Sequence, residues 1–137
     1  MVHAMQILLA EDDVQYRSVL REALELYGHT VLVAADGVEA YDLLAKHGNI
    51  EVIISDINMP RRTGTQLQEI VRDSSHLKHI PFVYITGFAI LRAATPLEGN
   101  NLDFIVSKVP FDRLLRLVEE LSLSGRILPD KNIAINR

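Results

Sequence analysis

The residues of this sequence that could do chemistry stand at four places, each of which begins within two residues of the end of a short apolar run. They are the acidic run Glu11, Asp12 and Asp13, the carboxylate of Asp56, the hydroxyl of Thr86 and the amine of Lys108. Carboxylates a few ångström apart repel, so either one of them stays protonated or a cation binds. Oxygen ligands favour Mg²⁺ over zinc or copper. A carboxylate beside such a metal can attack phosphorus, while a lysine and a hydroxyl bind the oxygens that gather charge.

This chemistry requires a fold that brings the four places together, and the apolar pattern predicts one. The runs at residues 7–10, 31–34, 52–54, 82–85 and 104–106 are mostly apolar at consecutive positions. That pattern favours parallel strands that are covered on both faces. Amphipathic stretches alternate with the runs, so we expect an α/β fold with a doubly wound, five-stranded parallel sheet flanked by helices. In such sheets ligands bind beyond the carboxyl ends of the strands, where the four places would meet.

Local signals mark several helices. Asp13 stands where it could cap the first helix, which would stop at Gly28, and Thr63 with Gln66 forms a capping box before a later helix. Pro110 suits the first turn of the last helix. The buried face that we expect for the second helix consists of Val38, Tyr41, Leu44 and Ala45. A helix near residues 88–95 should be short or irregular because Pro96 interrupts it.

Length and composition limit the class of protein. The 137 residues suit one domain, which we place at residues 1–123 with a C-terminal tail at 124–137. The chain has no cysteine and no apolar run near the ~20 residues that span a bilayer, and its start does not resemble a secretory signal. We therefore expect a cytoplasmic protein. The net charge of −4 argues against a non-specific nucleic-acid surface.

Taken together, these motifs resemble the receiver domains of two-component response regulators. The resemblance covers about residues 5–123 and rests on the stretch 7–13, the stretch 54–60 with Gly64, and the spacing from Asp56 to Thr86 and on to Lys108. It implies the flavodoxin-like receiver fold. It also implies a protein that accepts a phosphoryl group and changes its surface, and that is not a conventional enzyme.

The resemblance also implies a role for each matching residue. Asp56 would be the phosphoacceptor. Thr86 would hydrogen-bond one phosphoryl oxygen, and Lys108 would pair with another. The metal would be Mg²⁺, and its ligands would be Glu11, Asp12, Asp56 and the backbone carbonyl of Asn58.

Two positions depart from the family pattern. The family usually has a proline directly after the lysine, often joined by a cis bond, whereas here Val109 stands between Lys108 and Pro110. The family often has a switch aromatic three residues before the lysine, and here that residue is Ile105. Phe104 is its neighbour, and neighbours on a strand point to opposite faces, so Phe104 cannot replace the aromatic.

The function that we expect is phosphorelay signal transduction by a receiver without a DNA-binding domain. Its partners would be a sensor histidine kinase or a histidine phosphotransfer protein, together with a downstream protein target, and a homodimer is compatible with the pattern. One alternative is a degenerate receiver that serves only for docking or dimerisation. Another is a phosphatase with an aspartyl nucleophile, but such enzymes need a second carboxylate where this chain has Asn58. The residue two after the threonine, Phe88, is expected to slow hydrolysis of the aspartyl phosphate.

Overall fold

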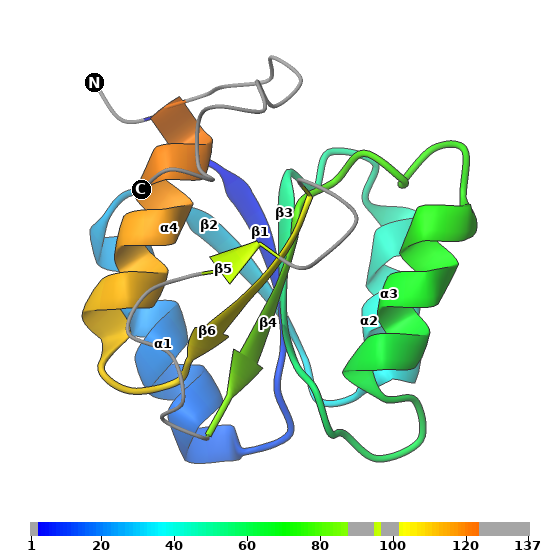
Figure 1. The fold of residues 1–137 in the computed structure, drawn as a ribbon, viewed down its shortest axis with the longest axis horizontal. Coiled ribbons are helices and arrows are strands. Elements are labelled where there is room, and N and C mark those ends of the chain that lie inside the picture. The colour runs from blue at the N-terminus through cyan, green and yellow to red at the C-terminus, as the bar shows by residue number, and fades with distance from the viewer. Residues whose placement is uncertain (1–2, 88–94, 97–101, 124–137) are drawn as a thin grey trace.

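The computed structural model describes residues 3–87, 95–96 and 102–123. Strands and helices alternate through most of the chain, as the apolar pattern predicts (Figure 1). In chain order the elements are β1 (Gln6–Ala10), α1 (Val14–Leu26), β2 (Thr30–Ala34), α2 (Gly37–Lys46), β3 (Val52–Asp56), α3 (Gly64–Asp73), β4 (Phe82–Thr86), β5 (Thr95–Pro96), β6 (Asp103–Ser107) and α4 (Phe111–Leu123).

The sheet confirms the expected topology and adds one short strand. Its order is β2-β1-β3-β4-β6-β5, and the first five of these strands run parallel. The sixth, β5, pairs antiparallel with β6. A proline-containing pair of residues is tolerated at the edge of a sheet because proline cannot donate to an inner ladder. The expected short helix near residues 88–95 falls mainly on residues 88–94. These residues, which include Phe88, lie outside the described residues, and so does the tail at 124–137.

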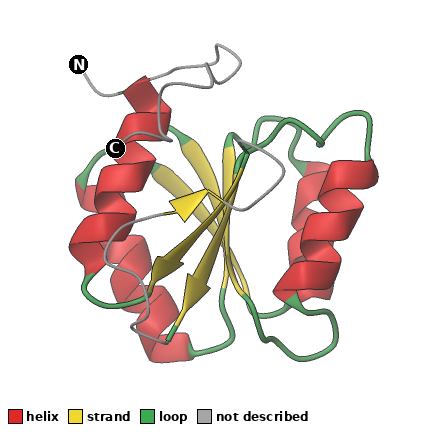
Figure 2. Cartoon of the chain, viewed as in Figure 1, coloured by secondary structure: helices red, strands yellow, loops and turns green. Residues whose placement is uncertain are grey.

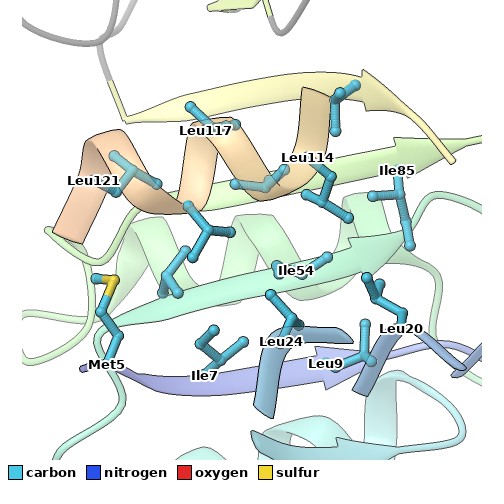
Figure 3. Packing of buried hydrophobic residues seen from close by; sticks show 14 of the residues in the cluster. Met5, Ile7, Leu9, Leu20, Leu24, Ile54, Ile85, Leu114, Leu117 and Leu121 are labelled. Atoms are coloured by element: carbon cyan, nitrogen blue, oxygen red, sulfur yellow. The ribbon is translucent and has the colours of Figure 1, made fainter. Parts of the chain in front are cut away.

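Two hydrophobic cores explain why the strands are apolar at consecutive positions. The helices α1 and α4 cover one face of the sheet and α2 and α3 cover the other, which gives three layers (Figure 2). Alternate residues of each strand point into opposite layers. On the α1 and α4 side, Ile7, Leu9 and Ile54 of the sheet pack against Leu20, Leu24 and Leu114 (Figure 3). Leu8, Ile53 and Phe82 point to the other side, where they meet Leu44, Leu67 and Val71.

The helix ends follow the expected signals. The Asp13 carboxylate accepts the N–H of Tyr16 at 3.1 Å and caps α1, and Gly28 lies just beyond the end of that helix with φ +94°. Thr63 and Gln66 form the capping box of α3. These contacts satisfy N–H groups that a helix leaves without a partner at its first turn.

The prediction for the buried face of α2 was wrong in part. Leu44 is buried, but Tyr41 and Ala45 are exposed. The residues that turn inward with Leu44 are Gly37 and Ala40. Small residues let α2 approach its neighbours closely, and Tyr41 instead lies under the guanidinium of Arg62, 5.8 Å from the ring centre.

Candidate functional site

The carboxyl ends of four neighbouring strands bring the predicted residues to one edge of the sheet. Glu11 and Asp12 directly follow β1, Asp56 ends β3, Thr86 ends β4, and Lys108 directly follows β6. Since β1, β3, β4 and β6 are consecutive in the sheet, these five residues lie side by side across it. In Figure 1 the arrowheads of β4 and β6 mark this edge, which is also where α1 begins.

Three carboxylates form an acidic cluster at this edge. One oxygen from each of Glu11, Asp12 and Asp56 lies within 4.8 Å of the other two. Glu11 is fully buried, the Asp56 side chain is 15% exposed, and Asp12 is open to solvent. The cluster therefore runs from the interior to the surface, and Asp56 stands where a ligand from solvent can reach it.

Lys108 is the cation of the site. Its Nζ lies 2.8 Å from Oε1 of Glu11 and 3.4 Å from Oδ2 of Asp56. The insertion of Val109 therefore does not displace the lysine from the acidic cluster, and the cis peptide bond of this loop joins Val109 to Pro110. The Lys108 backbone N–H also donates to the carbonyl of Thr86 at 2.8 Å, which ties the loop to β4.

Burial makes ionisation of the two inner carboxyl groups costly. It raises the pKa of Glu11, against the opposing effects of Lys108 and of the Asp13 backbone N–H. Burial likewise raises the pKa of Asp56, although the charge of Lys108 works the other way. For Lys108 itself burial lowers the pKa, but Glu11 and Asp56 outweigh that effect and the net pKa is raised. Burial therefore outweighs the effect of the Lys108 charge on the pKa of both carboxyl groups.

The residues present fit a hard divalent cation. Every side-chain atom that the acidic cluster offers is an oxygen, as Mg²⁺ prefers. Oε1 of Glu11 is buried and makes no well-formed hydrogen bond besides its ion pair with Lys108. A cation beside Asp12 and Asp56 would favour the ionised carboxylates and so oppose the effect of burial, which raises the pKa values of Glu11 and Asp56.

Two further predicted residues flank Asp56. Thr86 is buried at the end of β4, one position beyond Ile85, the register partner of Asp56. Asn58 is exposed and lies two residues after Asp56 in the loop between β3 and α3. That loop must stay close to the strand, because a Cβ atom on Gly64 would collide with the Asp56 carbonyl.

Sequence reasoning missed two residues that support the site from α1. The Tyr16 hydroxyl donates to the Lys108 carbonyl at 2.7 Å, and the Lys108 ammonium lies over the Tyr16 ring. Arg17 donates to the Glu11 carbonyl at 2.7 Å. Tyr16 counts as an apolar-face residue in the helical pattern, and its hydroxyl gives no sequence signal of its partner.

The structure confirms that Phe104 and Ile105 point to opposite faces of β6. Phe104 is buried in the core beneath α1 and α4, while Ile105 packs at the edge of the other core. Ile105 lies opposite Tyr84 in the register of β4 and β6. No aromatic ring of β6 therefore stands on the face that Ile105 occupies.

Comparisons with known proteins agree with this architecture. The family model of the response regulator receiver domain matches residues 7–119. A chemotaxis protein CheY homolog of Campylobacter jejuni is 36% identical over 83 residues, which cover 60% of this chain and 64% of that protein. The response regulator protein FleR of Pseudomonas aeruginosa is 33% identical over 121 residues, which cover 88% of this chain and 25% of FleR.

Solved structures give the same result. The chemotaxis response regulator CheY4 of Vibrio cholerae superposes with a TM-score of 0.60 at 34% identity, over 63% of this chain and 71% of CheY4. The chain thus spans less than two thirds of the Campylobacter relative and a quarter of FleR.

Proposed function

This chain belongs to the response regulator receiver domain family, and from that premise we propose that it accepts a phosphoryl group from a phosphohistidine partner onto Asp56. Membership of the family supports phosphorelay signalling in general. The specific assignment to Asp56 rests on one observation. This carboxylate ends β3 and lies between the acidic pair Glu11 and Asp12 and the ammonium of Lys108.

The reaction exchanges one bond to phosphorus for another. An Asp56 carboxylate oxygen forms a bond to phosphorus as the bond from phosphorus to the partner's imidazole nitrogen breaks, and the electron pair of that bond returns to the imidazole. The phosphoryl oxygens carry negative charge throughout, so positive charge placed around them stabilises the transition state.

The residues around Asp56 suit this need. Lys108 can turn from its carboxylate partners to a phosphoryl oxygen, and Thr86 at the end of the next strand can donate a hydrogen bond to another. Glu11, Asp12, Asp56 and the carbonyl of Asn58 would hold Mg²⁺. When bound, Mg²⁺ supplies a second centre of positive charge for the phosphoryl group.

Phosphorylation would act as a signal rather than as turnover of a substrate, so we propose a self-phosphorylating switch and not a conventional enzyme. Its partners would be a sensor histidine kinase or a histidine phosphotransfer protein, and a downstream protein target, in the cytoplasm. A homodimer is compatible with this function. In the part of the chain that the structure describes, no helix could cross a membrane.

The experiment is labelling with a small phosphodonor such as acetyl phosphate, followed by intact mass. We expect the wild-type protein to gain one phosphoryl group only when Mg²⁺ is present, and Asp56→Asn to gain none. Asp13→Asn is the matched control, because it changes a nearby carboxylate but preserves a good helix cap. Labelling of Asp56→Asn at the wild-type level would refute the assignment.

The docking-only alternative predicts a different result, namely no label on the wild-type protein. Val109 and Ile105 are the departures that prompt it. It is not favoured, because Lys108 still reaches the acidic cluster. The phosphatase alternative fails on Asn58, which cannot serve as the acid or base that such enzymes place there.

A further inference from the structure

Lys108 needs support that the strand alone does not give. It stands just after the end of β6, and the residue that follows it, Val109, is 60% exposed. A lysine side chain has many rotamers, and fixing it in one costs conformational entropy. The carboxylates of Glu11 and Asp56 hold the ammonium in the structure, but a phosphoryl oxygen would compete with them for it.

Tyr16 of α1 contacts Lys108 at both ends of the residue. Its hydroxyl donates to the Lys108 backbone carbonyl at 2.7 Å. Its ring lies beneath the ammonium, with Nζ 5.0 Å from the ring centre, which is within the range of a cation–π contact. Neither contact uses an oxygen of the acidic cluster, so both can persist when the ammonium changes its carboxylate partners.

Tyr16 is itself held in place from two sides. Its backbone N–H donates to the carboxylate of Asp13, the residue that caps α1 beside Asp12. Its ring packs edge-on against Phe111, the first residue of α4, with the ring centres 5.6 Å apart. Tyr16 therefore links the acidic start of α1 to the loop that carries Lys108.

We propose that Tyr16 is a positioning residue that holds the backbone and the ammonium of Lys108 for phosphoryl transfer. This inference rests on the proposed function of Asp56. In this chain Val109, and not a proline, follows Lys108, and the side chain of Tyr16 from α1 would hold the lysine in place. The two contacts divide between the hydroxyl and the ring, so two substitutions separate them.

Tyr16→Phe removes the hydrogen bond and keeps the ring. The net value of one such bond corresponds to a fall of about two- to tenfold in the rate of Asp56 phosphorylation. Tyr16→Leu removes both contacts and should lower the rate further, by about tenfold or more. Tyr27→Phe and Tyr27→Leu are matched controls, because Tyr27 follows the other end of α1 and is 58% exposed. Neither should change the rate.

The decisive experiment is a double-mutant cycle with Lys108→Ala, using acetyl phosphate and Mg²⁺ and with each rate corrected for the folded fraction from urea unfolding. If Tyr16 acts through Lys108, Tyr16→Leu lowers the rate about tenfold in the wild-type background and less than twofold in the Lys108→Ala background. An equal loss in both backgrounds would overturn the inference, because it would show a role independent of the lysine.

A second readout requires no phosphodonor. In the wild-type protein the ring current of Tyr16 should shift the NMR signals of the Lys108 methylene protons next to Nζ. Tyr16→Phe should keep that shift and Tyr16→Leu should abolish it, whereas signals that do not differ between wild type and Tyr16→Leu would overturn the inference. A wild-type protein that takes no label refutes the proposed function. A labelled wild type with an unchanged Tyr16→Leu rate refutes only the role of Tyr16.

Discussion

Asp56→Asn should make the protein more stable while abolishing phosphorylation. In the folded state the Asp56 carboxylate is partly removed from water, and burial raises its pKa. A carboxyl group with a raised pKa binds its proton more tightly in the folded protein than in the unfolded chain. Its ionised form therefore lowers the free energy of unfolding at neutral pH. An asparagine has nearly the same shape and no charge, so it avoids this cost.

The distances in the site indicate the size of the effect. At an effective dielectric constant of about 20, carboxylate charges within 4.8 Å of each other repel by at least about 3.5 kcal/mol, and opposite charges 3.4 Å apart attract by about 5 kcal/mol. The substitution Asp56→Asn removes repulsion from Glu11 and a screened repulsion from the exposed Asp12, but it also removes the attraction to Lys108. These effects nearly cancel, so the cost of burying the carboxylate decides the sign. We expect a gain of about 1–2 kcal/mol.

The measurement is urea unfolding at pH 7.5 without divalent cations, and again with Mg²⁺. Without Mg²⁺ the variant should unfold at higher urea than wild type with an unchanged m-value. Added Mg²⁺ should stabilise the wild type and close the gap, since a ligand that binds only the folded state stabilises it. The gain should shrink as the pH falls toward 3.8, where the unfolded chain also protonates the carboxyl group.

The control for this experiment is Asp42→Asn, an exposed aspartate on α2. Its stability should stay within about 0.5 kcal/mol of wild type. The reasoning is refuted if Asp56→Asn is less stable than wild type without Mg²⁺, because the ion pair with Lys108 would then outweigh burial.

Three other substitutions test separate parts of the structure. Asp12→Ala should weaken Mg²⁺ binding, measured by titration. Asp13→Ala should leave the Mg²⁺ affinity nearly unchanged and lower the free energy of unfolding by about 0.5–2 kcal/mol, because the α1 cap is lost. Equal losses of Mg²⁺ affinity in the two variants would contradict this difference. Arg72→Met should lower the free energy of unfolding by about 3–5 kcal/mol in urea titrations, because it leaves the buried Asp103 carboxylate without the guanidinium 2.6 Å away. Burial lowers the pKa of His29, so its contribution to stability is present above about pH 6.5 and is lost as the pH falls below that value. His29→Asn should weaken this pH dependence in unfolding curves between pH 7.5 and 5.5, and an unchanged dependence would show that other groups cause it.

Most of the fold could be predicted because its signals are local. A strand covered on both faces must be apolar at consecutive positions, and five such runs appear in the sequence. Once the strands are parallel, their carboxyl ends share one edge, so chain order places Glu11, Asp12, Asp56, Thr86 and Lys108 at that edge, whereas their order along it depends on how the strands pair. The caps at Asp13 and Thr63 were equally readable, because each needs only a partner three residues along the chain.

The features that could not be predicted depend on contacts between distant segments. The edge strand β5 has two residues, too few for any periodicity. The inward face of α2 is set by how closely the β3–α3 loop approaches, since a Cβ atom on Gly37 would collide with the Arg62 carbonyl. Tyr16 and Lys108 are 92 residues apart, and nothing local to either residue marks their contact.

The arrangement of charge links the stability of the site to its function. Three carboxylates face one lysine ammonium, so the site at rest carries more negative than positive charge. Burial of these carboxylates costs stability, and under the proposed function their net negative charge would attract a divalent cation to this edge of the sheet. Exact compensation by a second lysine would stabilise the fold but would compete with the metal for the same oxygens. The raised pKa of Asp56 follows mainly from its burial, and under the proposed function a divalent cation beside it would favour the ionised carboxylate that phosphoryl transfer needs.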